Sequence, residues 1–377
     1  MMPGTTRTRR PTSRLRPAVL GPVALGLAVL ALASAAPQAG QQMRSTEPHG
    51  LTAVPGIKVG HYTLTQRPTG CTAILVDGDG AVGGVSQRGA APGTRETDLL
   101  DPLNMVDRVN AIVLTGGSAF GLDSASGVVR WLEEHGFGFN TGVARVPIVP
   151  AAVIFDLNVG NNPKVRPGAD CGYRAATAAS DRPVVEGSVG AGAGATLGKI
   201  GGFAPGGKYG AMKGGVGTGS VTLPNGLIVG AIAVVNAVGD VVDPRTGRVV
   251  AGVRNADGTL ADARALLRSG ALLPPSTPGR NTTIAVVATN AKLSKAQAGR
   301  LALMADDGLA RALNPSHTNG DGDTVFALAT GRWGGSADIS TIGALAAEAL
   351  TEAILRAATE AKGLPGFPAV RDLKPSR

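Results

Sequence analysis

Gly279-Arg280-Asn281-Thr282-Thr283-Ile284-Ala285-Val286-Val287-Ala288-Thr289 is the stretch on which the interpretation of this chain depends. It follows residues 272–280, a run with three prolines that cannot extend a helix or a central strand. Residues 282–289 are apolar and rich in β-branched side chains, which predicts a buried strand. The sequence therefore places a threonine at the mouth of a buried strand, directly after an exposed segment.

Cleavage between Asn281 and Thr282 would give Thr282 both a hydroxyl and a free α-amine. The pKa of an α-amine is about 7.7–8.0, so near neutral pH it can take the proton of the hydroxyl beside it. Thr282 is therefore a candidate nucleophile that needs no histidine. A second interpretation stands beside it, because Asn281-Thr282-Thr283 is an N-x-T glycosylation sequon and a polar turn before a strand is common.

The composition indicates a folded chain with one large domain or two ordinary ones. The 377 residues are 43% hydrophobic and include 56 glycines, roughly twice the usual share. Such a chain is not a disordered linker, and its glycines predict tight turns and close backbone contacts.

Residues 1–35 have the pattern of a signal peptide. Five arginines between Arg7 and Arg16 precede an apolar run, Ala18 to Ala36, which contains Ala33-Ser34-Ala35 near its end. A basic segment, an apolar segment and an A-x-A site predict export and removal of the segment; the alternative is an uncleaved anchor. We therefore expect a secreted or periplasmic, extracytoplasmic protein.

Charge and cysteine content limit the partners. Removal of the five arginines in the signal segment lowers the formal net charge from +9 to +4. With few aromatic residues and no Lys/Arg cluster, the mature chain is not expected to bind nucleic acid. Cys71 and Cys171 can pair in an oxidising compartment or remain two buried thiols, and the sequence does not decide between these states.

Ser118 is a second candidate nucleophile. It follows an apolar strand and a glycine turn and precedes a helix, as in a nucleophile elbow. However, Phe120 occupies the position of the second glycine in G-x-S-x-G, and no histidine and acid follow in convincing positions. A helix N-terminus that faces a ligand or a loop is the preferred interpretation of this segment.

No cofactor or metal is expected. Residues 190–195 are close to a dinucleotide fingerprint, but Lys213 stands near the place of the ribose-binding acid, and a P-loop lysine is absent. Residues 319–323 begin like a calcium loop, but Thr324 and Thr330 replace its glycine and its terminal glutamate. The sequence also lacks HExxH and Cys/His clusters.

Several further elements are predicted along the chain. Residues 71–76 and 81–86 form two strands around Asp77-Gly78-Asp79-Gly80, which predicts a hairpin. Ser294 and Gln297 form a capping box for a helix that runs to about Leu313. Asn236 ends a long apolar strand, where it either caps the following turn or donates to an oxyanion.

The chain resembles the DmpA-type family of self-processing hydrolases, which includes L-aminopeptidase/D-esterases, β-peptidyl aminopeptidases and pantetheine hydrolases. The resemblance covers about residues 50–331 and rests on an ordered set of motifs: Gly-x-x-Val-Gly-His-Tyr near the start, Thr-Gly-Gly-Ser-Ala-Phe-Gly-Leu at 115–122, Gly-Ala-Gly-Ala-Gly-Ala-Thr at 190–196, Lys-Gly-Gly-Val-Gly-Thr-Gly-Ser at 213–220, Asn236, Asn-Thr-Thr at 281–283 and Asp-Gly-Asp-Thr at 321–324.

The resemblance implies an α/β (α+β) fold, a four-layer α-β-β-α sandwich of the DmpA/ornithine-acetyltransferase type. It implies cleavage before a Ser or Thr into an α chain, residues 36–281, and a β chain, residues 282–377, of a single catalytic domain. The two chains stay associated, and the αβ units form a homo-oligomer. By the same resemblance, Thr282 is the nucleophile and Asn236 the oxyanion donor, while Asp321 and Asp323 occupy the place of a Ser-Gly-Glu pair that orients and polarises the nucleophile.

One stretch departs from the family pattern. Aminopeptidase members carry Glu-x-Tyr where this chain has Ala151 and Val153, and an apolar stretch cannot pair with an ammonium group. Glu96, Asp98 and Asp156 are the candidate acids to replace it from a neighbouring loop.

The sequence therefore predicts an exported N-terminal-nucleophile hydrolase that cleaves itself at Asn281-Thr282 and then acts on small peptide or amide substrates as an aminopeptidase, amidase or esterase. The alternatives are a non-catalytic secreted binding protein with the same fold and a serine hydrolase that uses Ser118.

Overall fold

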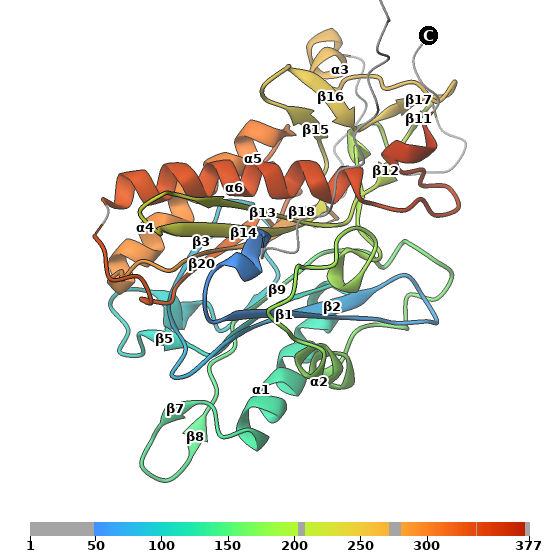
Figure 1. Ribbon diagram of the computed structural model, residues 1–377. Coiled ribbons are helices and arrows are strands. Elements are labelled where there is room, and N and C mark those ends of the chain that lie inside the picture. Colours follow the sequence, from blue (N-terminus) through green and yellow to red (C-terminus); the bar gives the residue numbers. More distant parts are fainter. Residues whose placement is uncertain (1–48, 203–207, 271–279, 337, 374–377) are drawn as a thin grey trace, which may run out of the picture. The chain divides into compact units, whose positions relative to one another are not determined.

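Two β-sheets lie face to face, with helices on both outer faces (Figure 1). The computed structural model describes residues 49–202, 208–270, 280–336 and 338–373. The predicted signal peptide, residues 1–35, and most of the proline-containing run before Asn281 lie outside these ranges.

The first sheet has five strands in the order β1-β2-β6-β9-β4, and the second has six in the order β13-β14-β18-β20-β3-β5. The bounds in the first sheet are β1 (Ile57–Thr63), β2 (Gly70–Val76), β6 (Ala111–Thr115), β9 (Ala151–Val153) and β4 (Thr94–Arg95). Those in the second are β13 (Val216–Thr222), β14 (Ile228–Asn236), β18 (Thr282–Thr289), β20 (Thr324–Ala329), β3 (Ala81–Gln87) and β5 (Arg108–Val109).

Helices cover the outer face of each sheet. On the first sheet lie α1 (Ser124–Glu134) and α2 (Ala169–Thr177); on the second lie α4 (Lys295–Ala305), α5 (Asp307–Ala312) and α6 (Ile339–Thr359). The α-β-β-α sandwich that the resemblance implied is therefore confirmed (Figure 1).

Short elements, besides several 3₁₀ helices, connect these layers. They are α3 (Ala263–Ser269) and four small pairings: β7 (Phe139–Asn140) with β8 (Arg145–Val146); β10 (Thr196–Leu197) with β12 (Met212–Lys213); β11 (Tyr209–Gly210) with β17 (Arg254–Asn255); and β15 (Asp240–Asp243) with β16 (Arg248–Ala251) and β19 (Leu313–Asn314).

Strand β18 lies in the middle of the second sheet and is buried on both faces. Ile284 and Val286 point into the core between the two sheets, whereas Ala285 and Val287 point into the core under α4, α5 and α6. A strand covered on both faces has apolar residues at successive positions, which explains the continuous apolar run. The strand predicted to follow Asn281 is confirmed.

Two glycines show why the chain needs so many. A Cβ atom on Gly217 of β13 would lie 2.1 Å from the carbonyl oxygen of Ala353 in α6. On the other outer face, a Cβ on Gly60 of β1 would lie 2.1 Å from the carbonyl oxygen of Ala175 in α2. Both helices therefore pack directly on strand backbone, as the composition predicted.

Two sequence predictions about connectivity are wrong. Strands β2 and β3 do not form a hairpin: β2 pairs with β1 and β6 in the first sheet, and β3 pairs with β20 and β5 in the second. The Asp77–Gly80 turn instead carries the chain from one sheet to the other. The helix predicted from Ser294 to Leu313 is two helices, α4 and α5, which meet at Asp306, although its capping box is present as expected.

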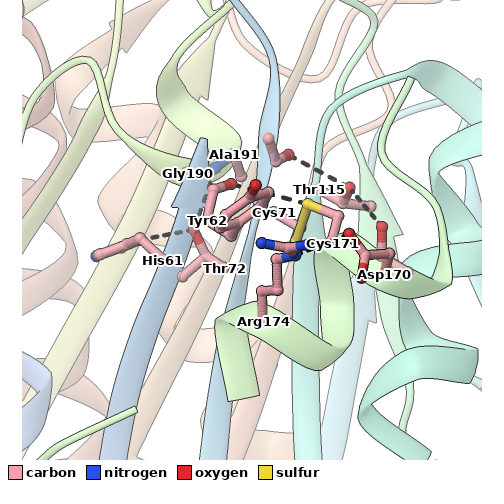
Figure 2. Close-up of a disulfide and its surroundings, with 12 residues drawn as sticks. His61, Tyr62, Cys71, Thr72, Thr115, Asp170, Cys171, Arg174, Gly190 and Ala191 are labelled. Carbon is pink, nitrogen blue, oxygen red and sulfur yellow. Dashed lines mark hydrogen bonds and ion pairs between the residues drawn. A yellow bond between two sulfur atoms is a disulfide. The ribbon is translucent and has the colours of Figure 1, made fainter. Parts of the chain in front are cut away.

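The structure pairs Cys71 and Cys171, whose Cα atoms are 6.2 Å apart. The disulfide joins β2 to α2 and therefore ties the helix layer to the first sheet (Figure 2). The question that the sequence left open is thus answered in favour of a disulfide. Within the described ranges, no helix combines the length and the apolar character needed to cross a membrane.

Candidate active site

Three strand ends of the second sheet meet at one edge. Strand β14 ends at Asn236, and β18 begins at Thr282, which is its register partner. Strand β20 runs parallel to β18 and begins at Thr324. The segment that carries Asp321 and Asp323 therefore reaches the same edge, and all four predicted site residues lie together.

The hydroxyl of Thr282 is in contact with the carbonyl that precedes it. Its Oγ1 donates a hydrogen bond to the carbonyl oxygen of Asn281, and the backbone N–H of Gly322 donates to the same oxygen at 3.0 Å. A Cβ atom on Gly322 would lie 3.0 Å from Thr282 Oγ1, so this position has little room for a side chain. The candidate nucleophile and a backbone donor therefore both contact the oxygen of the carbonyl that precedes Thr282.

The burial of Asn281 and Thr282 argues against the interpretation of this segment as a glycosylation sequon. The side chains of Asn281 and Thr282 are only 2% and 5% exposed. A glycosylating enzyme needs an accessible asparagine, so the folded chain does not offer Asn281 as an acceptor.

Asn236 is fully buried and its side chain is held in one orientation. Its Oδ1 accepts hydrogen bonds from Thr196 N (3.0 Å), Thr196 Oγ1 (3.3 Å) and Lys199 Nζ (3.0 Å). Its Nδ2 therefore faces the other way and donates to the carbonyl oxygens of Phe155 (3.2 Å) and Arg280 (3.5 Å). Among the described residues, this side chain makes no bond to the turn after β14, so the turn-cap interpretation is not supported.

Lys199 was missed by the sequence reasoning. It lies in the short 3₁₀ helix Lys199–Gly201, and its Nζ donates to the Asn236 carbonyl oxygen at 2.7 Å and to that of Arg280 at 3.1 Å. Burial lowers the pKa of Lys199 to about 7, although the negative charges of Asp321 and Asp323 act in the opposite direction. No sequence signal marks this residue, because it is a single lysine within a glycine-rich segment.

The two aspartates have different partners. Asp323 Oδ1 accepts the backbone N–H of Thr283 at 2.7 Å, so Asp323 is bonded directly to the second residue of β18. Asp321 Oδ2 accepts from the backbone N–H (2.8 Å) and the hydroxyl (2.7 Å) of Thr318, while its buried Oδ1 has no hydrogen-bond partner in the part of the chain that the structure describes. Burial, followed by the charge of Asp323, raises the pKa of Asp321.

The acid that directly follows the apolar Ala151–Phe155 stretch in the sequence is already paired with a buried arginine. Asp156 is fully buried and forms an ion pair with the equally buried Arg67, with Nη2 and Oδ1 2.9 Å apart. The same Oδ1 accepts from Gly117 N (2.9 Å), and Oδ2 accepts from Thr69 Oγ1 (2.6 Å). Asp156 is therefore not free to bind a substrate amine.

Ser118 lacks the partners of a serine nucleophile. Its backbone is left-handed, with φ of 55°, and its N–H donates to the carbonyl oxygen of Ile154. Within the described ranges no hydrogen bond joins its hydroxyl to a histidine or any other base. The same ranges contain no group of three or more His, Cys, Asp or Glu side chains arranged to hold a metal ion.

A second buried lysine holds the glycine-rich segment that leads to Thr196, a hydrogen-bond partner of Asn236. Lys213 is fully buried, and its Nζ donates to the carbonyl oxygens of Gly192 (2.8 Å), Ala195 (3.0 Å) and Gly214 (2.7 Å). It therefore fixes the glycine-rich turn that leads to Thr196. Burial lowers the pKa of Lys213 to about 7, against the opposing charge of Asp156.

This lysine predicts a specific dependence of stability on pH. The pKa of an unfolded lysine is about 10.4, so between pH 7 and that value the unfolded chain binds one more proton than the folded chain. The free energy of unfolding should therefore gain about 1.4 kcal/mol per pH unit from this residue. We expect Lys213→Met to lose this gain between pH 7.5 and 9.5, measured by urea unfolding in an uncleaved Thr282→Ala background. Parallel pH curves for the two proteins would contradict the assignment.

Comparison with known proteins gives consistent results. Residues 49–371 match the sequence profile of peptidase family S58. An uncharacterised aminopeptidase of Mycobacterium tuberculosis is 44% identical over 354 residues, which cover 87% of this chain and 98% of the relative. A 6-aminohexanoate-oligomer endohydrolase of Kocuria sp. is 30% identical over 319 residues, which cover 81% of this chain and 84% of the relative.

Solved structures share the fold. A β-aminopeptidase of Burkholderia sp. has a TM-score of 0.61 at 24% identity, over 83% of this chain and 87% of that chain. The L-aminopeptidase D-Ala-esterase/amidase of Ochrobactrum anthropi, described as a variant of the Ntn hydrolase fold, has a TM-score of 0.62 at 20% identity, over 86% of this chain and 91% of that chain.

Proposed function

The chain belongs to peptidase family S58, the DmpA family that its motifs resemble, and is a hydrolase of peptide or amide bonds; we propose that Thr282 is its nucleophile and becomes active by self-cleavage at Asn281-Thr282. The observation that carries the proposal is the contact of Thr282 Oγ1 with the Asn281 carbonyl, whose oxygen also accepts the Gly322 N–H. That arrangement supports attack on the chain's own peptide bond.

Self-cleavage takes two steps. Thr282 Oγ1 bonds to the carbonyl carbon of Asn281, the bond from that carbon to the Thr282 nitrogen breaks, and the hydroxyl proton ends on that nitrogen. The Gly322 N–H stabilises the oxyanion that forms in between. Water then hydrolyses the ester, leaving a carboxyl group on Asn281 and a free α-amine and hydroxyl on Thr282.

Turnover uses the same oxygen. The α-amine of Thr282 takes the proton from Oγ1, which attacks the carbonyl carbon of a substrate amide; the leaving amine takes the proton, and water releases the acyl group. Departure of the segment that ends at Asn281 removes the Arg280 carbonyl from Asn236 Nδ2 and from Lys199 Nζ. Both donors then become available to the oxygen of the substrate carbonyl.

Strand order supports continued association of the two chains after the cut. Strands β18 and β20, from the second chain, lie between β14 and β3, from the first. The cut chains therefore share the ladders β14–β18 and β20–β3, together with the core on both faces. The α and β chains should separate only on unfolding, and we propose that αβ units assemble further into a homo-oligomer.

We also propose that the enzyme acts outside the cytoplasm. The basic and apolar segment at residues 1–35 and the Cys71–Cys171 disulfide support this location, because disulfides persist mainly in oxidising compartments. Intact mass of the purified protein tests processing and export together. Two chains of about residues 36–281 and 282–377 are expected, and a single uncleaved chain that nevertheless hydrolyses amides would refute the mechanism.

The proposed substrates are small amides or peptides that need no free N-terminal amine. Ala151 and Val153 are apolar, and Asp156 is occupied by Arg67. One relative is named as an endohydrolase, an activity that cuts within a chain rather than at its amine end. An unpaired ammonium buried here would cost several kcal/mol, so the site favours neutral groups.

Matched anilides with free and acetylated amines test this specificity. We expect kcat/KM to differ by less than about tenfold between the two substrates. A loss of more than about 10²-fold on acetylation, equal to about 2.7 kcal/mol, would show that an acid elsewhere binds the amine. Glu96, whose Oε2 accepts Val149 N at 3.2 Å, would then be the first residue to replace.

A further inference from the structure

A histidine and a third aspartate lie directly behind the catalytic pair. The Nδ1 of His317 is 3.0 Å from Asp323 Oδ2, and the backbone N–H of His317 donates to the same oxygen at 3.0 Å. The other ring nitrogen, Nε2, is 3.7 Å from Asp306 Oδ1. His317 therefore lies between two carboxyl groups, one of which is bonded to the nucleophile strand through Thr283 N.

Side chains in β3 and directly after it hold Asp306 in place. It lies at the junction of α4 and α5 and is 1% exposed. Its Oδ2 accepts from Ser86 Oγ in β3 at 2.6 Å, and Arg88 Nε is 3.5 Å from the same oxygen. The other oxygen, Oδ1, has no hydrogen-bond partner among the described residues and is the atom nearest to His317 Nε2. A buried carboxyl placed in this way favours a charged imidazolium beside it.

We propose that His317, held by Asp306, is a positioning residue that fixes the Asp323 carboxyl against the start of β18. The inference rests on the proposed function of the Asp321–Asp323 pair. The ring and the backbone N–H of His317 both face Asp323 Oδ2, while Asp323 Oδ1 accepts the backbone N–H of Thr283, so His317 sets the position of a carboxyl that is bonded to β18. Burial and the charge of Asp323 raise the pKa of Asp321, whereas its hydrogen bonds from Thr318 and the charge of Lys199 act to lower it.

The charges around His317 determine whether self-cleavage is expected to slow as the pH rises or as it falls. Burial and Arg88 act to lower the pKa of His317, but the hydrogen bond and charge of Asp323 and the charge of Asp306 outweigh them and raise it. The imidazolium is therefore present below this raised pKa and is lost as the pH rises through it. Above that pH, Asp323 loses its charged partner, and self-cleavage should slow.

Two substitutions separate the parts of this arrangement. His317→Asn removes the charge but keeps an amide near the position of Nδ1, and asparagine tolerates the left-handed backbone there, with φ of 54°. Asp306→Asn keeps the shape of the side chain and removes the charge facing Nε2. His135→Asn is the matched control, because His135 is exposed at the end of α1, stacked on Trp131.

Self-cleavage of freshly synthesised precursor is followed on denaturing gels across pH. Wild type should lose rate on the alkaline side. His317→Asn should be slower by roughly tenfold and should lack this alkaline decrease in rate, because the charged partner 3.0 Å from Asp323 Oδ2 is gone. Asp306→Asn should shift the decrease to lower pH, and His135→Asn should match wild type. Profiles of His317→Asn and Asp306→Asn that superimpose on wild type would overturn the proposal.

Histidine NMR in the uncleaved Thr282→Ala chain provides a readout that does not depend on catalysis. The four histidines are few enough to assign by single substitutions. The pKa of His317 should lie above its usual value in the Thr282→Ala chain and fall when Asp306 is also replaced by Asn; an unchanged value would overturn the role of Asp306. If wild type is never cleaved, the proposed function fails, whereas this titration still decides the coupling of His317 to Asp306.

Discussion

Thr282→Ala is expected to abolish self-cleavage, so that the variant remains one chain where the wild type gives two. The substitution removes the hydroxyl that is proposed to attack the Asn281 carbonyl and keeps the Cβ at the start of β18. Intact mass should show one species, and amide hydrolysis should fall by at least about 10⁴-fold, because the nucleophile is lost.

Two variants at the same position control for folding. Thr282→Ser keeps the hydroxyl and should still be cleaved, whereas Thr282→Val keeps the volume without the hydroxyl and should remain intact. Cleavage of the valine variant at Asn281 would mean that another group attacks this bond. Hydrolysis that survives in the uncleaved alanine variant would favour a nucleophile such as Ser118.

The central strand and the nucleophile candidate were predictable because their signals are local. A run of β-branched residues after prolines predicts a buried strand wherever it lies, and Thr282 heads that strand as expected. Asn236 ends a strand of the same apolar kind and proves to be the register partner of Thr282. Local pattern therefore located two candidate site residues, although only the sheet order shows that they are neighbours.

The rest of the site depends on contacts between distant segments. Lys199 reaches Asn236 across 37 residues of sequence, and Asp306 holds Ser86 across 220. Neither contact leaves a pattern in the sequence near the residue. The turn at Asp77–Gly80 has the residues of a hairpin, yet it joins two sheets, because β2 and β3 find their partners elsewhere.

Under the proposed mechanism, the two reactions use different oxyanion donors. The Asn281 carbonyl oxygen accepts from Gly322 N, whereas Asn236 Nδ2 is bonded one residue earlier, to the Arg280 carbonyl oxygen. The attack on Asn281 therefore has a donor that does not depend on Asn236. A substrate carbonyl, in contrast, enters a site from which the Arg280 carbonyl has left.

Asn236→Ala is consequently expected to lower turnover by about 10²–10³-fold, the usual cost of one oxyanion donor, while self-cleavage falls less. Stability should also drop by roughly 1–3 kcal/mol, because the Thr196 N–H and the Lys199 ammonium lose their acceptor, Oδ1. Thr196→Val is the matched control, since it removes one hydrogen bond to the same Oδ1 and leaves Nδ2 in place.

The two variants are compared by kcat/KM on one anilide, by urea unfolding and by the fraction of cleaved chain. Thr196→Val should keep turnover within about tenfold of wild type, because its lost hydroxyl contact is worth about 1 kcal/mol. If both variants lost equal rate, Asn236 would act only by holding Lys199 and Thr196 in place. A deficit of about 2.7–4 kcal/mol in transition-state energy for Asn236→Ala, beyond that of the control, assigns the Nδ2 donor to the oxyanion.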